Sequence, residues 1–109
     1  MADTFKVLGQ LVPSATTLTT LYTVPGATST VNASLVVCNR GSGATTFRVS
    51  VAVAGAADDP KQYIYYDVTI NGNDTFIATI GVTLAATDLV RVYAGNGNLT
   101  FSLFGVEIS

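Results

Sequence analysis

The sequence has no histidine and no tryptophan, a single cysteine, and only 11% charged residues among its 109. Without histidine it lacks the side chain that most often exchanges protons near neutral pH, and the usual base that activates a serine or cysteine nucleophile. Cys38 has no second cysteine with which to form an internal disulfide. These absences predict a protein that is not an enzyme and that holds no cofactor or metal ion.

Basic residues are few and dispersed along the chain. The five are Lys6, Arg40, Arg48, Lys61 and Arg91. A nucleic-acid surface needs clustered cations that neutralise several phosphates, so we expect no nucleic-acid partner. No apolar run is long enough to cross a membrane, and the first residues lack the apolar stretch of a secretory signal. We therefore expect no membrane partner. A single cysteine, which forms no internal disulfide, is also compatible with folding in a reducing cytoplasm.

The acidic residues give little sign of a chemical site. Asp58 and Asp59 form the only adjacent acidic pair. A calcium ion needs about six to eight converging oxygen ligands, and a glycosidase needs two carboxylates flanking a sugar cleft. The aspartates instead fall mostly in expected turns, where a carboxylate caps the turn with its own side chain. The sequence therefore favours a structural role for them.

Alternation of apolar and polar residues predicts β-strands. Segment 46–53 has large apolar residues at alternate positions, namely Phe47, Val49, Val51 and Val53. Segment 31–37 has the same pattern, at Val31, Ala33, Leu35 and Val37. A period of two places each set on one buried face. The link 39–44 is rich in Asn, Gly and Ser, so we expect these two strands to pair as a hairpin.

Further strands are expected at 16–24, 62–70, 75–82, 89–94 and 99–108, separated by turn residues such as the Gly-Asn-Gly-Asn run at 95–98. Segment 62–70 is apolar or aromatic at both parities, so it is predicted to be covered on both faces. No segment has a helical period. About eight strands at spacings near ten residues predict an all-β, antiparallel β-sandwich or jelly-roll-like fold.

The last strand changes phase within itself. Its apolar residues change parity between Leu103 and Phe104, and Gly105 follows at once. A regular strand cannot bury both sets on one face. We therefore predict a β-bulge or a crossover between sheets at 103–105.

Residues 1–12 differ from the rest and end at Pro13. They are predicted to form either an N-terminal arm that docks on a neighbouring subunit or an edge strand of the same sandwich. Residues 13–109 are predicted to form a single β-sandwich domain, which suits the length of the chain.

Several features favour association with other subunits. The mean hydropathy of +0.47 is high for an isolated soluble domain. The candidate interface residues are apolar or aromatic, namely Phe5, Val7, Leu8, Tyr22, Tyr63 and Tyr65. Tyr63 and Tyr65 are predicted to share one face, where they would pack in the core, contact a neighbouring subunit, or form a platform for a ligand.

Four strings carry a resemblance to a known family. They are LYTVPG (21–26), VVCNRGSGATTFRVSVAVAG (36–55), KQYIYYDVTINGNDTF (61–76) and FSLFGVEIS (101–109). Over nearly the whole chain, from about residue 6, the sequence resembles small structural proteins of tailed bacteriophages. No motif with an assigned role comes with the resemblance, so it transfers no functional residue.

The resemblance implies a virion component assembled in the cytoplasm of the bacterial host. Its first implied role is a capsid decoration (cement) protein that binds the major capsid protein or other virion proteins and forms a homo-oligomer, with a trimer favoured. A tail, neck or baseplate component is the alternative. A second alternative is a carbohydrate-binding module of a receptor-binding fibre, in which Tyr65 would contact the sugar.

Overall fold

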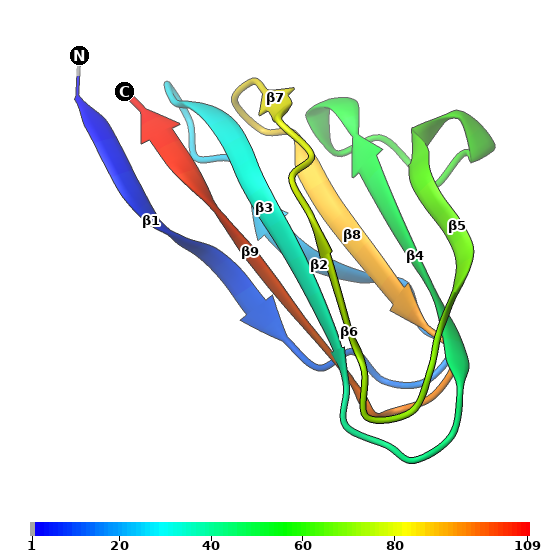
Figure 1. The fold of residues 1–109 in the computed structure, drawn as a ribbon. Coiled ribbons are helices and arrows are strands. Elements are labelled where there is room, and N and C mark those ends of the chain that lie inside the picture. The colour runs from blue at the N-terminus through cyan, green and yellow to red at the C-terminus, as the bar shows by residue number, and fades with distance from the viewer. Residues whose placement is uncertain (1) are drawn as a thin grey trace.

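The computed structural model describes residues 2–109, apart from the side chains of Asn32 and Ala33. Over this range the chain forms two β-sheets stacked face to face, joined by loops and two short 3₁₀ turns (Figure 1). The elements are β1 (Asp3–Leu11), β2 (Thr19–Thr23), β3 (Ser29–Asn39), β4 (Thr45–Ala52), η1 (Val53–Gly55), η2 (Pro60–Gln62), β5 (Tyr63–Ile70), β6 (Thr75–Ala78), β7 (Val82–Leu84), β8 (Leu89–Ala94) and β9 (Leu99–Ile108).

The two sheets have the strand order of a jelly roll. Sheet A runs β1-β9-β3-β6, with β7 also paired to β3, and sheet B runs β2-β8-β4-β5. Strands β6 and β7 pair with the two halves of β3 and act as one interrupted strand, broken at 79–81 where Gly81 has a φ of 57°. Counted in this way the sandwich has eight strands, the number typical of a jelly roll. The expected all-β antiparallel fold is confirmed.

The predicted hairpin between segments 31–37 and 46–53 is wrong, although both are strands. Strand β3 belongs to sheet A and β4 to sheet B, so the link between them crosses from one sheet to the other. The buried amide of Asn39 holds this crossing in place. Its Nδ2 donates to the carbonyl oxygens of Gly43 (2.9 Å) and Asn71 (3.2 Å), and its Oδ1 accepts from the backbone N–H of Gly41 (2.9 Å).

The core lies between the inner faces of the sheets. Phe47, Val49 and Val51 point into it as predicted, with Val51 only partly buried, whereas Val53 is 69% exposed because the strand ends at Ala52. Strand β5 is also less covered than expected. It is the edge strand of sheet B. Tyr66 is exposed on the outer side, where no layer packs, and Ile64 is exposed at the open edge between the sheets, near Ile80 and Val82.

The predicted irregularity at 103–105 is present, but the extra residues belong to the strands on either side. Along β1, Val7 pairs with Phe104 and Gly9 with Leu103, so one residue of β1 is extra. Along β3, a second shift falls between Asn32 and Ser34. Strand β9 itself is continuous, so Leu103 faces the core and Phe104 faces outward.

The shift in β3 also corrects the predicted face of that strand. Val31 pairs directly with Val106 on the outer side, whereas Leu35 and Val37 are fully buried. The side chain of Ala33, which was predicted to point inward with them, lies outside the described residues. A period-two pattern therefore holds only up to the bulge.

Strand β1 is an edge strand of sheet A. It pairs antiparallel with β9 from Asp3 to Leu11, and backbone hydrogen bonds between Ala2 and Ser109 extend this ladder to the chain ends. Residues 1–12 were predicted to form either an arm on a neighbouring subunit or an edge strand, and in the structure of the single chain β1 is an edge strand. Gly9 lets β1 approach sheet B, since a Cβ there would lie 2.4 Å from the carbonyl oxygen of Leu21 in β2.

A chain of polar contacts links the two sheets, buried at Tyr22 and Thr30 and exposed at Lys6. The hydroxyl of Tyr22 in β2 donates to Oε2 of Glu107 in β9 (2.5 Å), which leaves the Thr30 hydroxyl in β3 to donate to Tyr22 (2.8 Å). Nζ of Lys6 lies 3.2 Å from Oε1 of Glu107. Burial and the bond to Glu107 raise the pKa of Tyr22 from 10.0 to about 12. The bond from Tyr22, aided by Lys6, lowers the pKa of Glu107.

Replacement of Phe47 by alanine should lower the free energy of unfolding by about 3–5 kcal/mol, because a fully buried ring is lost and leaves a cavity. Urea denaturation followed by circular dichroism measures the change. Phe5→Ala is the matched control, since Phe5 is 80% exposed and its removal should change stability by less than about 0.5 kcal/mol. Equal effects of the two substitutions would contradict the assignment of the core.

Tyr22→Phe should lower stability near neutral pH by about 1.5–3 kcal/mol, because a hydrogen bond to a charged group is lost. Glu107 has a lowered pKa, so its contribution is present above its ordinary value of 4.5 and is lost as the pH falls through the folded value. Tyr22 has a raised pKa, so its contribution is lost as the pH rises from 10.0 towards about 12. Urea denaturation at about pH 3, 7 and 11 should therefore show the largest gap between wild type and variant at the middle value. A constant gap would contradict the linkage.

Candidate functional site

The described residues show no sign of a metal centre or of a membrane-spanning helix. No group of three or more acidic or cysteine side chains comes together in residues 2–109. The helical segments of that range are single 3₁₀ turns, none long and apolar enough to cross a bilayer. The surfaces that remain as candidates are an aromatic pocket on sheet B and the outer face of sheet A.

Irregular pairing in β5 places its tyrosines on different faces. Tyr63 pairs with Ser50 and Tyr65 with Val49, so Ile64 is an extra residue, and a second shift follows at Tyr66 and Asp67. Asp67 takes the left-handed conformation that such a bulge uses, with a φ of 51°. Tyr63 and Tyr66 therefore lie on the outer side of sheet B, while Tyr65 turns towards the core.

Arg48 of β4 is held between the rings of Tyr66 in β5 and Tyr93 in β8, the residue that pairs with Arg48 on the neighbouring strand. Its guanidinium carbon lies 4.2 Å from the ring centroid of Tyr66 and 4.4 Å from that of Tyr93. Its Nε donates to Oδ1 of Asp67 at 2.6 Å, with a longer bond of 3.4 Å from Nη2 to Oδ2. These bonds raise the pKa of Arg48 and fix the plane of its guanidinium.

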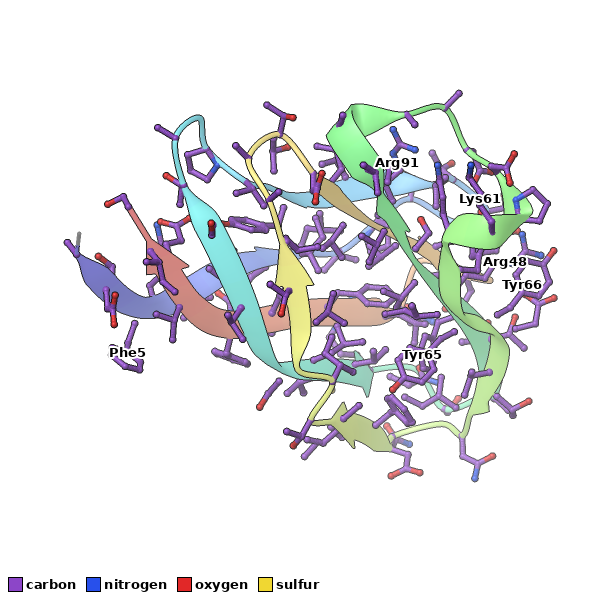
Figure 2. The ribbon with its side chains drawn as sticks, turned by 90° about the horizontal axis from the view of Figure 1, so that it is seen from above. Phe5, Arg48, Lys61, Tyr65, Tyr66 and Arg91 are labelled. Atoms are coloured by element: carbon purple, nitrogen blue, oxygen red, sulfur yellow. The ribbon has the colours of Figure 1, made fainter. Side chains whose placement is uncertain are left out.

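Beside Arg48 lies a pocket of about 510 Å³, lined by Arg48, Asp58, Pro60, Tyr63 and Tyr66. We call it the tyrosine pocket. The rings of Tyr63 and Tyr66 meet edge to face, 5.2 Å apart at 86°, and form a corner. Burial, and after it the nearby Asp58 carboxylate, raise the pKa of Tyr63. Figure 2 shows Arg48 and Tyr66 together at the end of the molecule opposite Phe5.

The outer face of sheet A mixes apolar side chains with uncharged polar ones such as Gln10, Ser34 and Ser102. Direct pairing places Phe5 beside Val106, Val7 beside Phe104, and Val36 beside Ile77 on this face. Phe5 is 80% and Ile77 69% exposed. Among the paired positions that the structure describes on this side, Asp3 is the only charged residue. The face thus has the composition of a contact surface between proteins.

The structure separates the predicted interface residues into three groups. Phe5 and Val7 lie on the outer face of sheet A, and Tyr63 lines the tyrosine pocket. Leu8 and Tyr22 are 9% and 7% exposed core residues, so the prediction that they contact a partner is wrong for the folded chain. Leu8 is the extra residue of the bulge in β1, and the bulge turns its side chain inward. Tyr22 is held in the core by its hydrogen bonds to Thr30 and Glu107 of the other sheet.

Tyr65 is not on one face with Tyr63, contrary to the prediction. Its ring packs against Phe76 at 5.4 Å and Phe47 at 6.2 Å, so it is a poor platform for a ligand. Sequence reasoning missed Arg48, Asp58 and Tyr66 as neighbours of Tyr63, and Ile77 as an exposed residue. The one available signal was the Tyr-Tyr-Asp run at 65–67, where a residue that tolerates positive φ follows two aromatic residues.

No family model and no curated protein matches the sequence. Among solved structures, the chain is similar to one from infectious bursal disease virus, described as "Structure of infectious bursal disease virus Gx strain". The TM-score is 0.53 and the sequence identity 7%. The match covers 97% of this chain but only 31% of the viral chain, so the present chain spans about a third of that protein. This similarity supports the fold alone.

Arg48→Lys should change the tyrosine signal in near-ultraviolet circular dichroism and lower stability by about 0.5–1 kcal/mol. Lysine keeps the charge but loses the planar fork to Asp67 and the stacking on two rings. Arg40→Lys is the control, because Arg40 contacts Thr100 and Gly97 and is not stacked on a tyrosine ring. An unchanged tyrosine signal in Arg48→Lys would show that the stack does not exist in solution.

Proposed function

We propose that this chain is a structural protein of a virion, and specifically a capsid decoration (cement) protein of a tailed bacteriophage. The observation that carries the proposal is the outer face of sheet A, where Phe5, Val7 and Ile77 expose large apolar side chains. Large apolar side chains exposed together on one face are a common mark of a surface that a partner covers. The occupant proposed for it is the outer surface of the major capsid shell.

Strand β1 adds a second means of contact at the margin of the same face. It is paired on one side only, with β9, so its other edge offers a row of backbone donors and acceptors. An extended segment of a neighbouring subunit can add to such an edge by β-augmentation. Backbone hydrogen bonds along β1 and apolar burial around Phe5 would thus act together in one interface.

Analogy of fold gives further support. Jelly rolls are common among viral capsid and lectin domains, and the similar solved structure comes from a virus by its description. Fold does not fix function, so this argument is weaker than that from the outer face of sheet A. The sequence resemblance to small structural proteins of tailed phages supports a role in the virion, and it covers capsid and tail components alike.

The mechanism is interfacial. Each copy forms contacts that exist only on the assembled shell, so binding stabilises the shell over free subunits by mass action. A trimer is the proposed arrangement, because it repeats one contact around a symmetry axis of the lattice. The low charge of the chain limits repulsion between copies crowded on one shell. No proton transfer or bound cofactor is required.

The copy number in purified particles tests the position in the virion. A decoration protein should be present at a level comparable to the major capsid protein, as counted in particle density or by quantitative mass spectrometry. A few copies or a few dozen copies per particle would instead support a tail, neck or baseplate component. Absence from particles would overturn the virion role altogether.

Phe5→Ser and Ile77→Ser should each weaken binding to shells by about tenfold, because an apolar side chain that becomes buried on docking is removed. Cosedimentation of the purified chain with shells that lack it measures this binding. Ile64→Ser is the matched control, since Ile64 is exposed on β5 of the other sheet. Equal loss in all three variants, or no loss in the first two, would contradict docking through sheet A.

A further inference from the structure

We propose that the tyrosine pocket on the outer side of sheet B binds an uncharged saccharide. The inference stands on different residues from the proposed docking face, which lies on the opposite sheet. Its volume of about 510 Å³ falls in the range of about 300–1,000 Å³ that is usual for small-ligand sites. The pocket has both the walls and the polar groups that a sugar ring needs.

The walls suit the apolar faces of a sugar ring. Tyr63 and Tyr66 meet at 86°, so a pyranose placed in the corner contacts the face of one ring and the edge of the other. Aromatic rings attract the C–H groups on the less polar side of a sugar because the ring faces carry negative potential. Tyrosine also has a hydroxyl at its tip, which can bond to a sugar hydroxyl at the mouth of the site.

The polar groups are of both hydrogen-bonding kinds. The carboxylate of Asp58 accepts hydrogen bonds, and the guanidinium of Arg48 donates them. Arg48 bonds to Asp67 through Nε and Nη2, and Nη1 has no bond in the described structure. A pair of sugar hydroxyls, each of which can donate and accept, matches this combination.

The charged residues of the pocket disfavour an anion, and the stacking of Arg48 on the tyrosine rings disfavours a cation. Asp67 neutralises Arg48, and Asp58 adds a negative charge, so an anionic ligand is not attracted. For a cation, one face of the Tyr66 ring is already taken by the Arg48 guanidinium, whose central carbon lies 4.2 Å from the ring centroid. An uncharged polyhydroxyl ligand avoids both penalties.

The walls are held in place before any ligand arrives. Asp59 accepts from the backbone N–H of Lys61 (3.1 Å) and caps the turn η2 that carries Pro60. The loop 56–62 is tied to the sheet by Arg91, which donates to the carbonyl oxygen of Ala56 (2.9 Å), and internally by Gln62, which donates to Ala57 (2.8 Å). A site that is already ordered loses less entropy on binding.

Nuclear magnetic resonance of the full chain with labelled tyrosine rings tests the inference. The probes are D-glucose, D-galactose and N-acetylglucosamine at rising millimolar concentrations, with choline as a cation and N-acetylneuraminic acid as an anion. At least one uncharged sugar should shift the ring signals of Tyr63 and Tyr66 but not that of buried Tyr22. No shift with any of the three sugars, or a stronger response to choline or to the anion, would overturn the inference.

Variants then place the binding site. Tyr66→Ala should weaken sugar binding by about tenfold, because one aromatic wall of the pocket is lost. The fold should tolerate this substitution, since the side chain of Tyr66 is exposed. Tyr63→Phe retains the ring and should weaken it less. Ile77→Ser on the opposite sheet should leave binding unchanged, whatever it does to docking on shells. Unaltered binding in Tyr66→Ala would place the sugar elsewhere and reject the pocket.

Discussion

Aromatic contact between the two sheets is the interaction on which the rest of the structure depends. Phe47 of sheet B lies 5.2 Å from Phe76 and 6.1 Å from Phe101, both in sheet A, as measured between ring centroids. With few charges available, the chain relies on such apolar burial for its stability. Each sheet uses its inner face for this contact, so the outer faces of the two sheets can differ in composition. The outer face of sheet A exposes aliphatic residues and Phe5, whereas that of sheet B holds the tyrosine pocket.

Bulges decide which side chains reach those outer faces. The shifts in β1 and β3 turn Phe5 and Val31 outward beside Val106, and the shifts in β5 turn Tyr63 and Tyr66 away from the core. A single extra residue reverses the face of everything beyond it, because side chains alternate along a strand. Two candidate binding surfaces therefore depend on a few irregular pairings rather than on a separate domain or a long loop.

The same property explains what could be predicted from the sequence. Composition and alternation predict an all-β sandwich, and the parity change at Leu103 and Phe104 predicts an irregularity there, because these depend on local pattern. The hairpin between segments 31–37 and 46–53 was wrong because a turn sequence does not state which sheet receives the next strand. Tyr65 was placed with Tyr63, and Leu8 at the surface, because a bulge leaves almost no local signal. Arg48 and Asp58 were missed because only the fold brings them together.

The pairing of the chain ends has a practical consequence. Ala2 and Ser109 exchange two backbone hydrogen bonds, of 2.7 and 3.0 Å, at one corner of sheet A, far from the tyrosine rings on sheet B (Figures 1 and 2). Chain ends that lie side by side make circular permutation, or insertion of the domain into a host polypeptide, easier to tolerate. A foreign sequence grafted at this corner would therefore be displayed without rearranging a strand.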